Sequence, residues 1–167
     1  NKYKSYIVMN SFSQNCNNIF FLFFNNYHIT DDVDAQITNP FAEKSLENLL
    51  YLKNWIDAVQ WHLEDIIRNP SIDPVEALKI KRRIDKSNQD RTDLVELIDS
   101  YFMEKYSQVK VASDAQINTE TPAWAIDRLS ILALKIYHMN VEASRQNASE
   151  EHIQQCKKKL ETLLTQT

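Results

Sequence analysis

The sequence predicts an all-α protein, an up-and-down bundle of about five helices arranged around one long central helical hairpin. Apolar residues recur at intervals of three and four positions along most of the chain, as they do on the buried face of a helix. Tight β-hairpins usually require glycine, and the chain contains none. Two long amphipathic arms are also joined by a short connector, NPSIDP. With 167 residues and 43% hydrophobic content, the chain is expected to form a single domain over residues 1–167.

The N-terminal part predicts one buried helix followed by an extended connector. Residues 1–10 are polar, and we expect a frayed terminus there, or material preceding a natural start at Met9. A helix is predicted over 13–28, because it contains the apolar run IFFLFF. That run is too short to cross a membrane or to form an ordinary signal-peptide core. Residues 29–40 are acidic and end at Pro40, which predicts an extended segment lying across the bundle.

The first arm of the hairpin has two stripes at helical spacing. The first is apolar and is expected to face the core: Leu49, Leu52, Ile56, Val59, Leu63 and Ile66. The second is mixed: Leu50, Asn54, Asp57, Trp61, Asp65 and Arg68. Leaving an indole or a leucine side chain in water forfeits about 2 kcal/mol of burial each. We therefore expect another helix to cover the second stripe and to carry its polar groups into a partly desolvated seam.

The second arm has an apolar face interrupted by one arginine. Arg91 lies seven residues after Ile84 and seven before Ile98, where an unpaired guanidinium would be strongly disfavoured. An acidic or amide partner is therefore expected. If the arms pair symmetrically about Ile72, three pairings follow: Asp57 with Asn88, Asn54 with Arg91, and His62 and Asp65 with Arg82.

Two more helices are predicted after the hairpin. Residues 107–119 have the alternating pattern of a short extended piece within a long loop. Thr121 and Pro122 are typical of an N-cap followed by the first helical residue, which predicts a helix over 122–143. Ser149 is a favourable N-cap for a last helix ending near Leu164.

The polar groups of these helices form one candidate binding seam, and two interpretations of it stay open. It is either a buried hydrogen-bond and ion-pair network that keeps the helices in register, or a ligand site. No residue is assigned as catalytic, and the chain is not expected to be an enzyme. The seam contains Asn54, Asp57, Trp61, His62, Glu64, Asp65, Arg68, Arg82, Asp85, Asn88, Arg91 and Asp127.

Composition excludes several classes of function. Without glycine, the phosphate-binding loops of the Walker and Rossmann types cannot form. A net charge of −4 with scattered Lys and Arg provides no basic surface for nucleic acid. No segment is predicted to enter a membrane. Cys16 and Cys156 are far apart and lack metal-ligand spacing, which favours free thiols in a cytoplasmic protein without a cofactor.

Three segments resemble a known family. They read YLKNWIDAVQWHLEDIIR (51–68), KRRIDKSNQDRTDLVELID (81–99) and PAWAIDRLS (122–130). They are similar to a bacterial family classified as a domain of unknown function, DUF4254, which is typical of Bacteroides-type bacteria. The resemblance covers most of the chain from about Phe12 onward. It implies an all-helical cytoplasmic protein, sometimes encoded near glycosyltransferases of the cell envelope.

Three functions are compared on this basis. The first is an interaction module that binds a protein partner or forms a homodimer. The second is a metal-dependent nucleotide or nucleotide-sugar pyrophosphohydrolase, in which Glu96 and Asp99 would bind Mg²⁺ as one ExxD half of a two-helix acidic site. Its matching ExxE half is missing, and Glu47 is the one substitute. The third is a sugar or nucleotide pocket at the seam, which requires a concavity at those residues.

Overall fold

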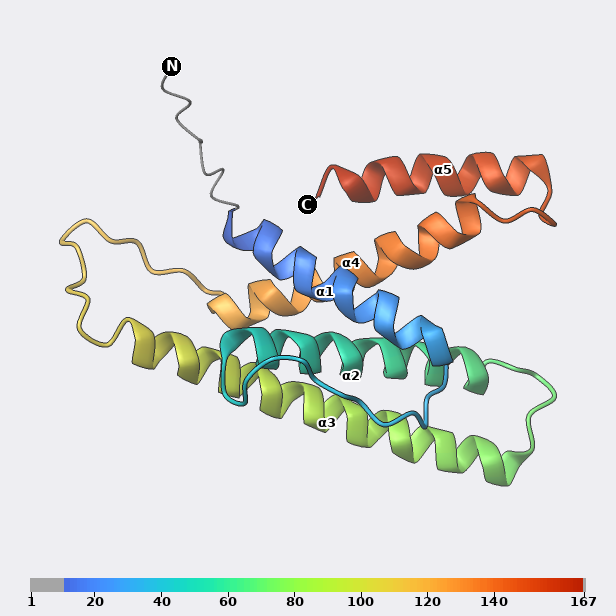
Figure 1. The fold of residues 1–167 in the computed structure, drawn as a ribbon, viewed down its shortest axis with the longest axis horizontal. Helices are drawn as coiled ribbons and strands as arrows, with labels where there is room; N and C mark the ends of the chain where they lie inside the picture. Colours follow the sequence, from blue (N-terminus) through green and yellow to red (C-terminus); the bar gives the residue numbers. More distant parts are fainter. Residues whose placement is uncertain (1–10, 167) are drawn as a thin grey trace, which may run out of the picture.

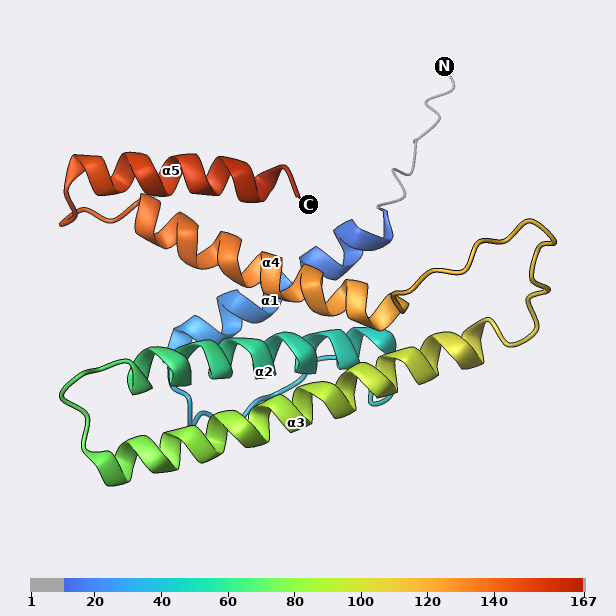
Figure 2. The same ribbon diagram turned by 180° about the vertical axis from the view of Figure 1, so that it is seen from behind.

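The computed structural model describes residues 11–166 and is all-helical, as predicted. The expected frayed segment, residues 1–10, lies outside the described residues. The helices of this part are α1 (Phe12–Thr30), α2 (Leu46–Ile67), α3 (Pro74–Lys105), α4 (Pro122–Ala143) and α5 (Glu150–Leu164). In Figure 1, α2 and α3 form the long hairpin, and α1 crosses α4 and reaches α2 with its C-terminal end. The reverse view in Figure 2 shows α4 on the same side of α2, between the hairpin and α5.

Each helix begins directly after a side chain that caps it. In all five N-caps a side-chain oxygen accepts a hydrogen bond from a backbone N–H of the first turn, which satisfies a donor that the helix itself leaves free. In α4 the cap is followed by proline at the first position, as the Thr121–Pro122 pair predicts. The five caps are Ser11, Ser45, Asp73, Thr121 and Ser149.

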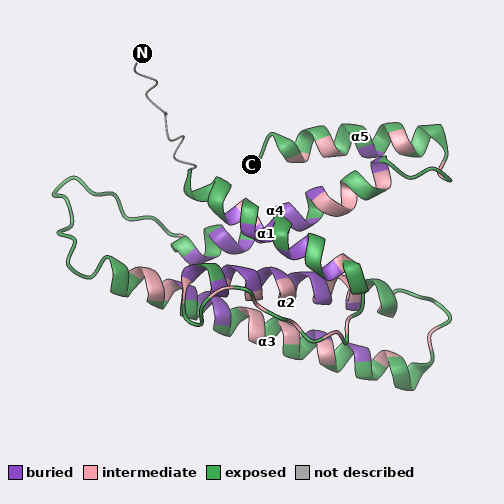
Figure 3. Cartoon of the chain, viewed as in Figure 1, coloured by how far each residue is buried: buried purple, intermediate pink, exposed green. Residues whose placement is uncertain are grey.

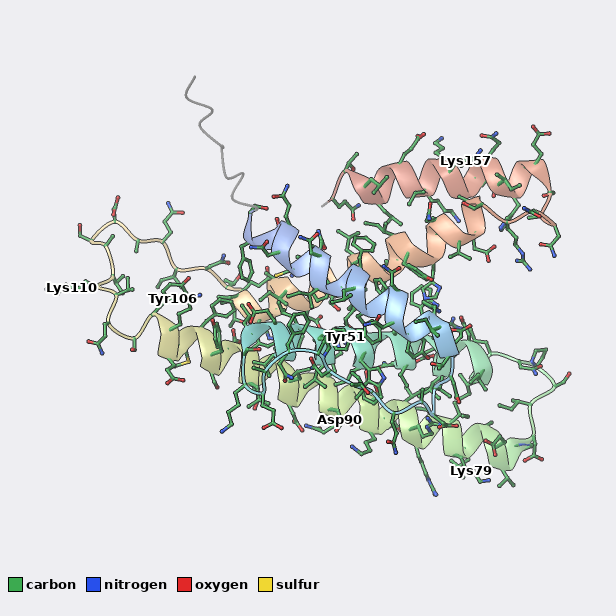
Figure 4. The ribbon with its side chains drawn as sticks, viewed as in Figure 1. Tyr51, Lys79, Asp90, Tyr106, Lys110 and Lys157 are labelled. Atoms are coloured by element: carbon green, nitrogen blue, oxygen red, sulfur yellow. The ribbon has the colours of Figure 1, made fainter. Side chains whose placement is uncertain are left out.

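The core is centred on α2, which is buried along most of its length (Figure 3). Phe20, Phe23 and Phe24 of the apolar run are at most 1% exposed, which confirms a buried first helix. Tyr51 lies in the middle of the bundle, whereas the labelled Lys79 and Asp90 lie on the outer side of α3 (Figure 4). None of the helices in the described range is long and apolar enough to cross a membrane.

The connector between α1 and α2 runs along the hairpin in an extended form (Figure 1). One guanidinium nitrogen of Arg83 donates to the carbonyl oxygen of Val33 at 3.2 Å and lies 2.8 Å from a carboxylate oxygen of Asp34. These contacts attach the connector to α3. The predicted strap across the bundle is therefore confirmed.

The mixed stripe of α2 is covered by a second helix over its N-terminal part, as expected, whereas Asp65 and Arg68 at its other end are exposed. Leu50 and Asn54 are 2% and 0% exposed, and Asn54 contacts Ser130 of α4. On the apolar stripe, Ile66 near the C-terminal end of α2 is less buried than predicted, at 40% exposed. α2 is therefore buried on two sides, and its polar groups lie inside the protein.

The pairing of the two hairpin arms differs from the prediction. Asn88 accepts a hydrogen bond from Gln60 instead of lying near Asp57. Arg91 lies beside Asp57 instead of Asn54. The symmetric register was therefore wrong by about one helical turn. The reason is that α2 and α3 are staggered along their axes, so the midpoint of the connector does not predict which residues face each other.

Candidate functional site

A buried polar cluster lies where α2, α3 and α4 meet. Lys53, Asn54 and Asp57 come from one side of α2, Arg91 comes from α3, and Asp127 and Ser130 come from α4. Lys53, Asn54 and Ser130 are 0% exposed, and Asp127 is 2% exposed. Helical spacing explains the arrangement, since residues 53 and 57 are one turn apart and so are 127 and 130. We call these six residues the seam cluster.

Asp127 is the acidic partner that Arg91 requires. Its two carboxylate oxygens accept hydrogen bonds from Nε and Nη2 of Arg91 at 2.8 and 2.5 Å, which is the bidentate geometry. Lys53 Nζ lies 2.9 Å from the same carboxylate and also bonds Asp57. The Nε atom of Arg91 is 3.8 Å from Asp57. Two cations and two carboxylates therefore neutralise each other in the interior.

Ser130 connects the cluster to Asn54. Its hydroxyl donates to Oδ2 of Asp57 at 2.6 Å and accepts from Nδ2 of Asn54 at 2.9 Å. Because a serine has one proton to donate, this arrangement also determines the orientation of the Asn54 amide. The Oδ1 atom of Asn54 is buried without a hydrogen-bond partner among the described residues.

The cluster shifts the pKa values of its two carboxyl groups in opposite directions. Burial raises the pKa of Asp57 above its ordinary value, and this outweighs the opposing effects of Lys53 and Ser130. Burial also acts to raise the pKa of Asp127, but hydrogen bonds and charges from Arg91 and Lys53 outweigh it, so that the net pKa is lowered. Environments that separate the pKa values of neighbouring carboxyl groups are frequent at functional sites.

A pocket of about 200 Å³ opens beside the cluster between α2, α3 and α4. Asp57 and Arg91 of the seam cluster both line it. Ile131 and Leu134 give it an apolar side. The other lining residues are Gln60, Trp61, Glu64 and Arg68. The pocket therefore combines an indole, carboxylates, an amide and guanidinium groups within a small volume.

The structure brings some of the predicted seam residues together and places the rest elsewhere. Asn54, Asp57, Arg91 and Asp127 meet in the cluster, and Trp61, Glu64 and Arg68 line the pocket. The others lie elsewhere. Asp65 pairs with Arg68 at 2.9 Å, and Asp85 pairs with Lys81. Asn88 accepts a hydrogen bond from Gln60, and Arg82 is exposed. His62 faces α1 and α4, where its ring lies near Tyr27 and His138.

The proposed Mg²⁺ ligands have other surroundings. Oδ1 of Asp99 accepts a hydrogen bond from the backbone N–H of Ala123 at 3.1 Å, at the start of α4. Glu96 is exposed on α3. Asn48, the neighbour of the substitute Glu47, is buried and donates to the carbonyl oxygen of Phe41. Within residues 11–166, Glu96 and Asp99 belong to no group of three or more side chains arranged to bind a metal.

Sequence reasoning missed Lys53 and Ser130. A buried lysine is rare unless it is paired, and Lys53 is adjacent to Asn54 and one turn before Asp57. That spacing was the available signal, since both neighbours belong to the stripe expected to be covered. Ser130 had no comparable signal, because a serine on a helix is usually at the surface.

Comparison with known proteins yields one result. No curated protein and no solved structure matches the chain. The family model described as "Protein of unknown function (DUF4254)" matches residues 47–167. The matched range contains all six residues of the seam cluster and the whole pocket lining, whereas α1 precedes it. The chain therefore belongs to the DUF4254 family.

Proposed function

We propose that this protein is a binding module that takes a small, hydroxyl-rich ligand of about the size of a monosaccharide into the pocket beside Asp57 and Arg91. The observation that carries the proposal is the composition of the pocket. Carboxylates accept hydrogen bonds from hydroxyl groups, guanidinium groups donate to ring and hydroxyl oxygens, and an indole packs against C–H surfaces. A volume of about 200 Å³ lies below the range of roughly 300–1,000 Å³ for drug-sized ligands, which favours a small ligand.

The buried cluster supports binding by holding the pocket in a defined shape. Asp57 contacts Lys53 and accepts a hydrogen bond from Ser130, and Asp127 binds the edge of the Arg91 guanidinium that carries Nε and Nη2. Side chains that are already ordered lose little conformational freedom when a ligand arrives. The two interpretations of the seam, a network that keeps the helices in register and a ligand site, are therefore compatible, because such a network also positions the ligand-binding groups.

A wider role follows from the same proposal. A sugar-binding module fits the association with envelope glycosyltransferases, and the cytoplasmic location, that the family resemblance implies. An interaction with a protein partner or a second copy is supported by large apolar side chains that are exposed around the connection between α3 and α4. They are Leu97, Met103, Tyr106, Val109, Val111, Ile117 and Trp124.

Ligand titration tests the pocket directly. The purified protein is titrated with monosaccharides, sugar phosphates and nucleotide sugars while the indole N–H resonance of Trp61 is followed by NMR. We expect one class of sugar to shift that resonance and to raise the melting temperature, since a ligand that binds the native state stabilises it. Glu64→Gln and Arg68→Ala should each weaken binding at least tenfold, because both side chains line the pocket.

Arg82→Ala and Asp85→Asn are the matched controls, because both residues are exposed on α3 outside the pocket. They should bind the ligand as the unchanged protein does. The proposal fails if no sugar of the panel moves the Trp61 resonance, or if the pocket variants and the controls bind equally well.

The pyrophosphohydrolase is the alternative proposal, and it rests on the ExxD spacing of Glu96 and Asp99. The same nucleotide-sugar panel tests it when Mg²⁺ is present and phosphate release is measured. Hydrolysis that requires Mg²⁺ and is lost in Glu96→Gln, with Arg68→Ala unaffected, would favour this alternative over the pocket.

A further inference from the structure

Three histidines from three different helices meet on the side of α2 that faces α1. His28 lies near the end of α1, His62 near the end of α2, and His138 in the second half of α4. Their ring centroids are 5.4–5.8 Å apart, and the rings meet edge to face. One ring nitrogen from each lies within 4.8 Å of the other two. Within residues 11–166 this is the one group of three or more side chains arranged to bind a metal ion.

The Nε2 atoms of the three rings make no hydrogen bond in the described part of the chain, and Nε2 of His62 lies 3.8 Å from Oδ1 of Asp31. All three Nε2 atoms are buried. Buried polar atoms nearly always have such a partner, so three unpaired nitrogens facing one point require an explanation. A metal ion provides it, because each neutral imidazole would donate a lone pair.

The surroundings lower the pKa of two of the three rings. Burial lowers the pKa of His62 and lowers that of His138 to about 4, and the neighbouring histidines add to both effects. A lowered pKa favours the neutral imidazole, which is the form that binds metal, because a protonated nitrogen has no lone pair to give.

Each ring is also held in position by an aromatic neighbour. Tyr137 stacks on His28 with centroids 4.5 Å apart, and Trp61 stacks on His138 at 4.9 Å with an interplanar angle of 4°. Tyr27 stacks on His62 at 5.5 Å. Rings that are fixed in this way need little reorganisation to present their nitrogens to an ion.

Asp31 completes the pattern of a metal-binding histidine. Its Oδ1 atom is 2.9 Å from Nδ1 of His28, so that Nδ1 is the protonated nitrogen and Nε2 is free to bind metal. Ligating histidines usually donate their second N–H to such a carboxylate, which orients the ring. Asp31 is held there because it caps the end of α1 in the left-handed conformation, with φ of 49°.

We propose that His28, His62 and His138 bind one divalent transition-metal ion of the Zn²⁺ type through their Nε2 atoms, with Asp31 as the positioning residue. Three imidazoles suit Zn²⁺, Co²⁺ or Ni²⁺ and disfavour Mg²⁺ and Ca²⁺, which prefer oxygen ligands. Tetrahedral coordination at about 2.0–2.1 Å would bring the nitrogens to roughly 3.3 Å from one another. The nitrogens, which lie within 4.8 Å of one another, would therefore have to approach one another by up to about 1.5 Å.

The ion would attach α1 to the α2–α4 seam. His28 is the one ligand that precedes the matched family range of 47–167, so the metal would bind the N-terminal helix to the part of the chain that contains the pocket. This inference is independent of the proposed sugar binding, because none of the three histidines lines the pocket. Trp61 is the one residue shared by the two sites.

Metal binding to the tag-free, chelator-treated protein tests the proposal. We expect equilibrium dialysis to show one Zn²⁺ per chain and Co²⁺ to produce the visible absorption of a tetrahedral nitrogen site. His62→Gln and His138→Gln should each lower the Zn²⁺ affinity at least a hundredfold. Asp31→Asn should lower it by about 10–100-fold, and it should leave the fold intact because Asn also adopts the left-handed conformation.

His152→Gln is the matched control, since His152 is exposed and its Nε2 already contacts Glu142 at 3.1 Å. It should bind Zn²⁺ as tightly as the unchanged protein. Circular dichroism in the presence of chelator establishes that each variant is folded before its affinity is compared. The proposal is overturned if the unchanged protein does not bind Zn²⁺ stoichiometrically or if Mg²⁺ competes equally. It is also overturned if His152→Gln abolishes binding while the folded His62→Gln and His138→Gln variants retain it.

Discussion

Asp57 and Ser130 are joined by a buried hydrogen bond of 2.6 Å, although 73 positions separate them in the sequence. The bond connects α2 to α4 at the point where Asp127 also binds Arg91 of α3. Three helices therefore meet at one group of polar side chains that bond to one another. Buried networks of this kind stabilise one helix register, because any shift would leave charged groups unpaired.

Removal of the Ser130 hydroxyl tests this connection. Ser130→Ala leaves the Asn54 amide without its acceptor and deprives Asp57 of a donor, so we expect the free energy of unfolding to fall by about 1–3 kcal/mol. Urea denaturation measures it. Ser100→Ala is the control, because Ser100 is exposed and bonds within its own helix; its effect should stay within about 0.5 kcal/mol. Equal effects of the two substitutions would contradict a linking role for Ser130.

Loss of the guanidinium at position 91 should destabilise the protein without unfolding it. Arg91→Met removes two charge-assisted hydrogen bonds from Asp127, and we expect a loss of about 1.5–3 kcal/mol. Lys53 remains 2.9 Å from Asp127, so the loss should stay below the roughly 3–5 kcal/mol that results from isolating a buried charge.

A double variant measures how strongly Arg91 and Asp127 stabilise each other. Arg91→Met combined with Asp127→Leu should cost less than the sum of the two single substitutions, since the second removes the carboxylate that has already lost its Arg91 partner in the first. Arg128→Met is the control, because the Arg128–Glu120 pair is at the surface and exposed pairs contribute about 0–1 kcal/mol. Strict additivity in the double variant would show that Arg91 and Asp127 do not stabilise each other.

The ion pair at Asp127 predicts a pH dependence below pH 4. The folded-state pKa of Asp127 is lower than its ordinary value of 3.8, so between the two values the unfolded chain binds more protons than the folded protein. The contribution of Asp127 to stability is thus fully present above about pH 4 and is lost as the pH falls through the folded-state pKa.

Chemical denaturation at several pH values measures this slope. Asp127→Asn should show a weaker decline in the free energy of unfolding below pH 4, because the titrating group is absent. Asp85→Asn, at an exposed pair with Lys81, is the matched substitution and should keep the slope of the unchanged protein. If Asp127→Asn and the unchanged protein lose stability in parallel, Asp127 does not determine the acid sensitivity.

Cys16 should be unreactive until the protein unfolds. It is 1% exposed, and burial raises the pKa of its thiol to about 11. Relative to an ordinary thiol at 9.0, this lowers the thiolate fraction about a hundredfold, and the thiolate is the reactive form. Alkylation of a Cys156→Ser variant should therefore be slow in buffer and fast in denaturant. Rapid alkylation in buffer would mean that α1 detaches from the core.

Local signals in the sequence were sufficient to define the helices. The helix predicted over 122–143 begins and ends where α4 does, because Thr121 and Pro122 act within one turn of the chain. The first helix was predicted two residues shorter at its C-terminal end than α1. Capping, proline and apolar periodicity depend on neighbouring residues alone, and for that reason they can be read from one sequence.

The sequence alone also determined that Arg91 needs an acidic or amide partner and that the mixed stripe of α2 needs a cover. Only the tertiary structure decided that the partner is Asp127, that Lys53 lies inside, and that His28, His62 and His138 converge. The physical reason is that these contacts depend on how far the helices are staggered and at what angle they cross. Those quantities result from side-chain packing over the whole bundle, and no local pattern of residues encodes them.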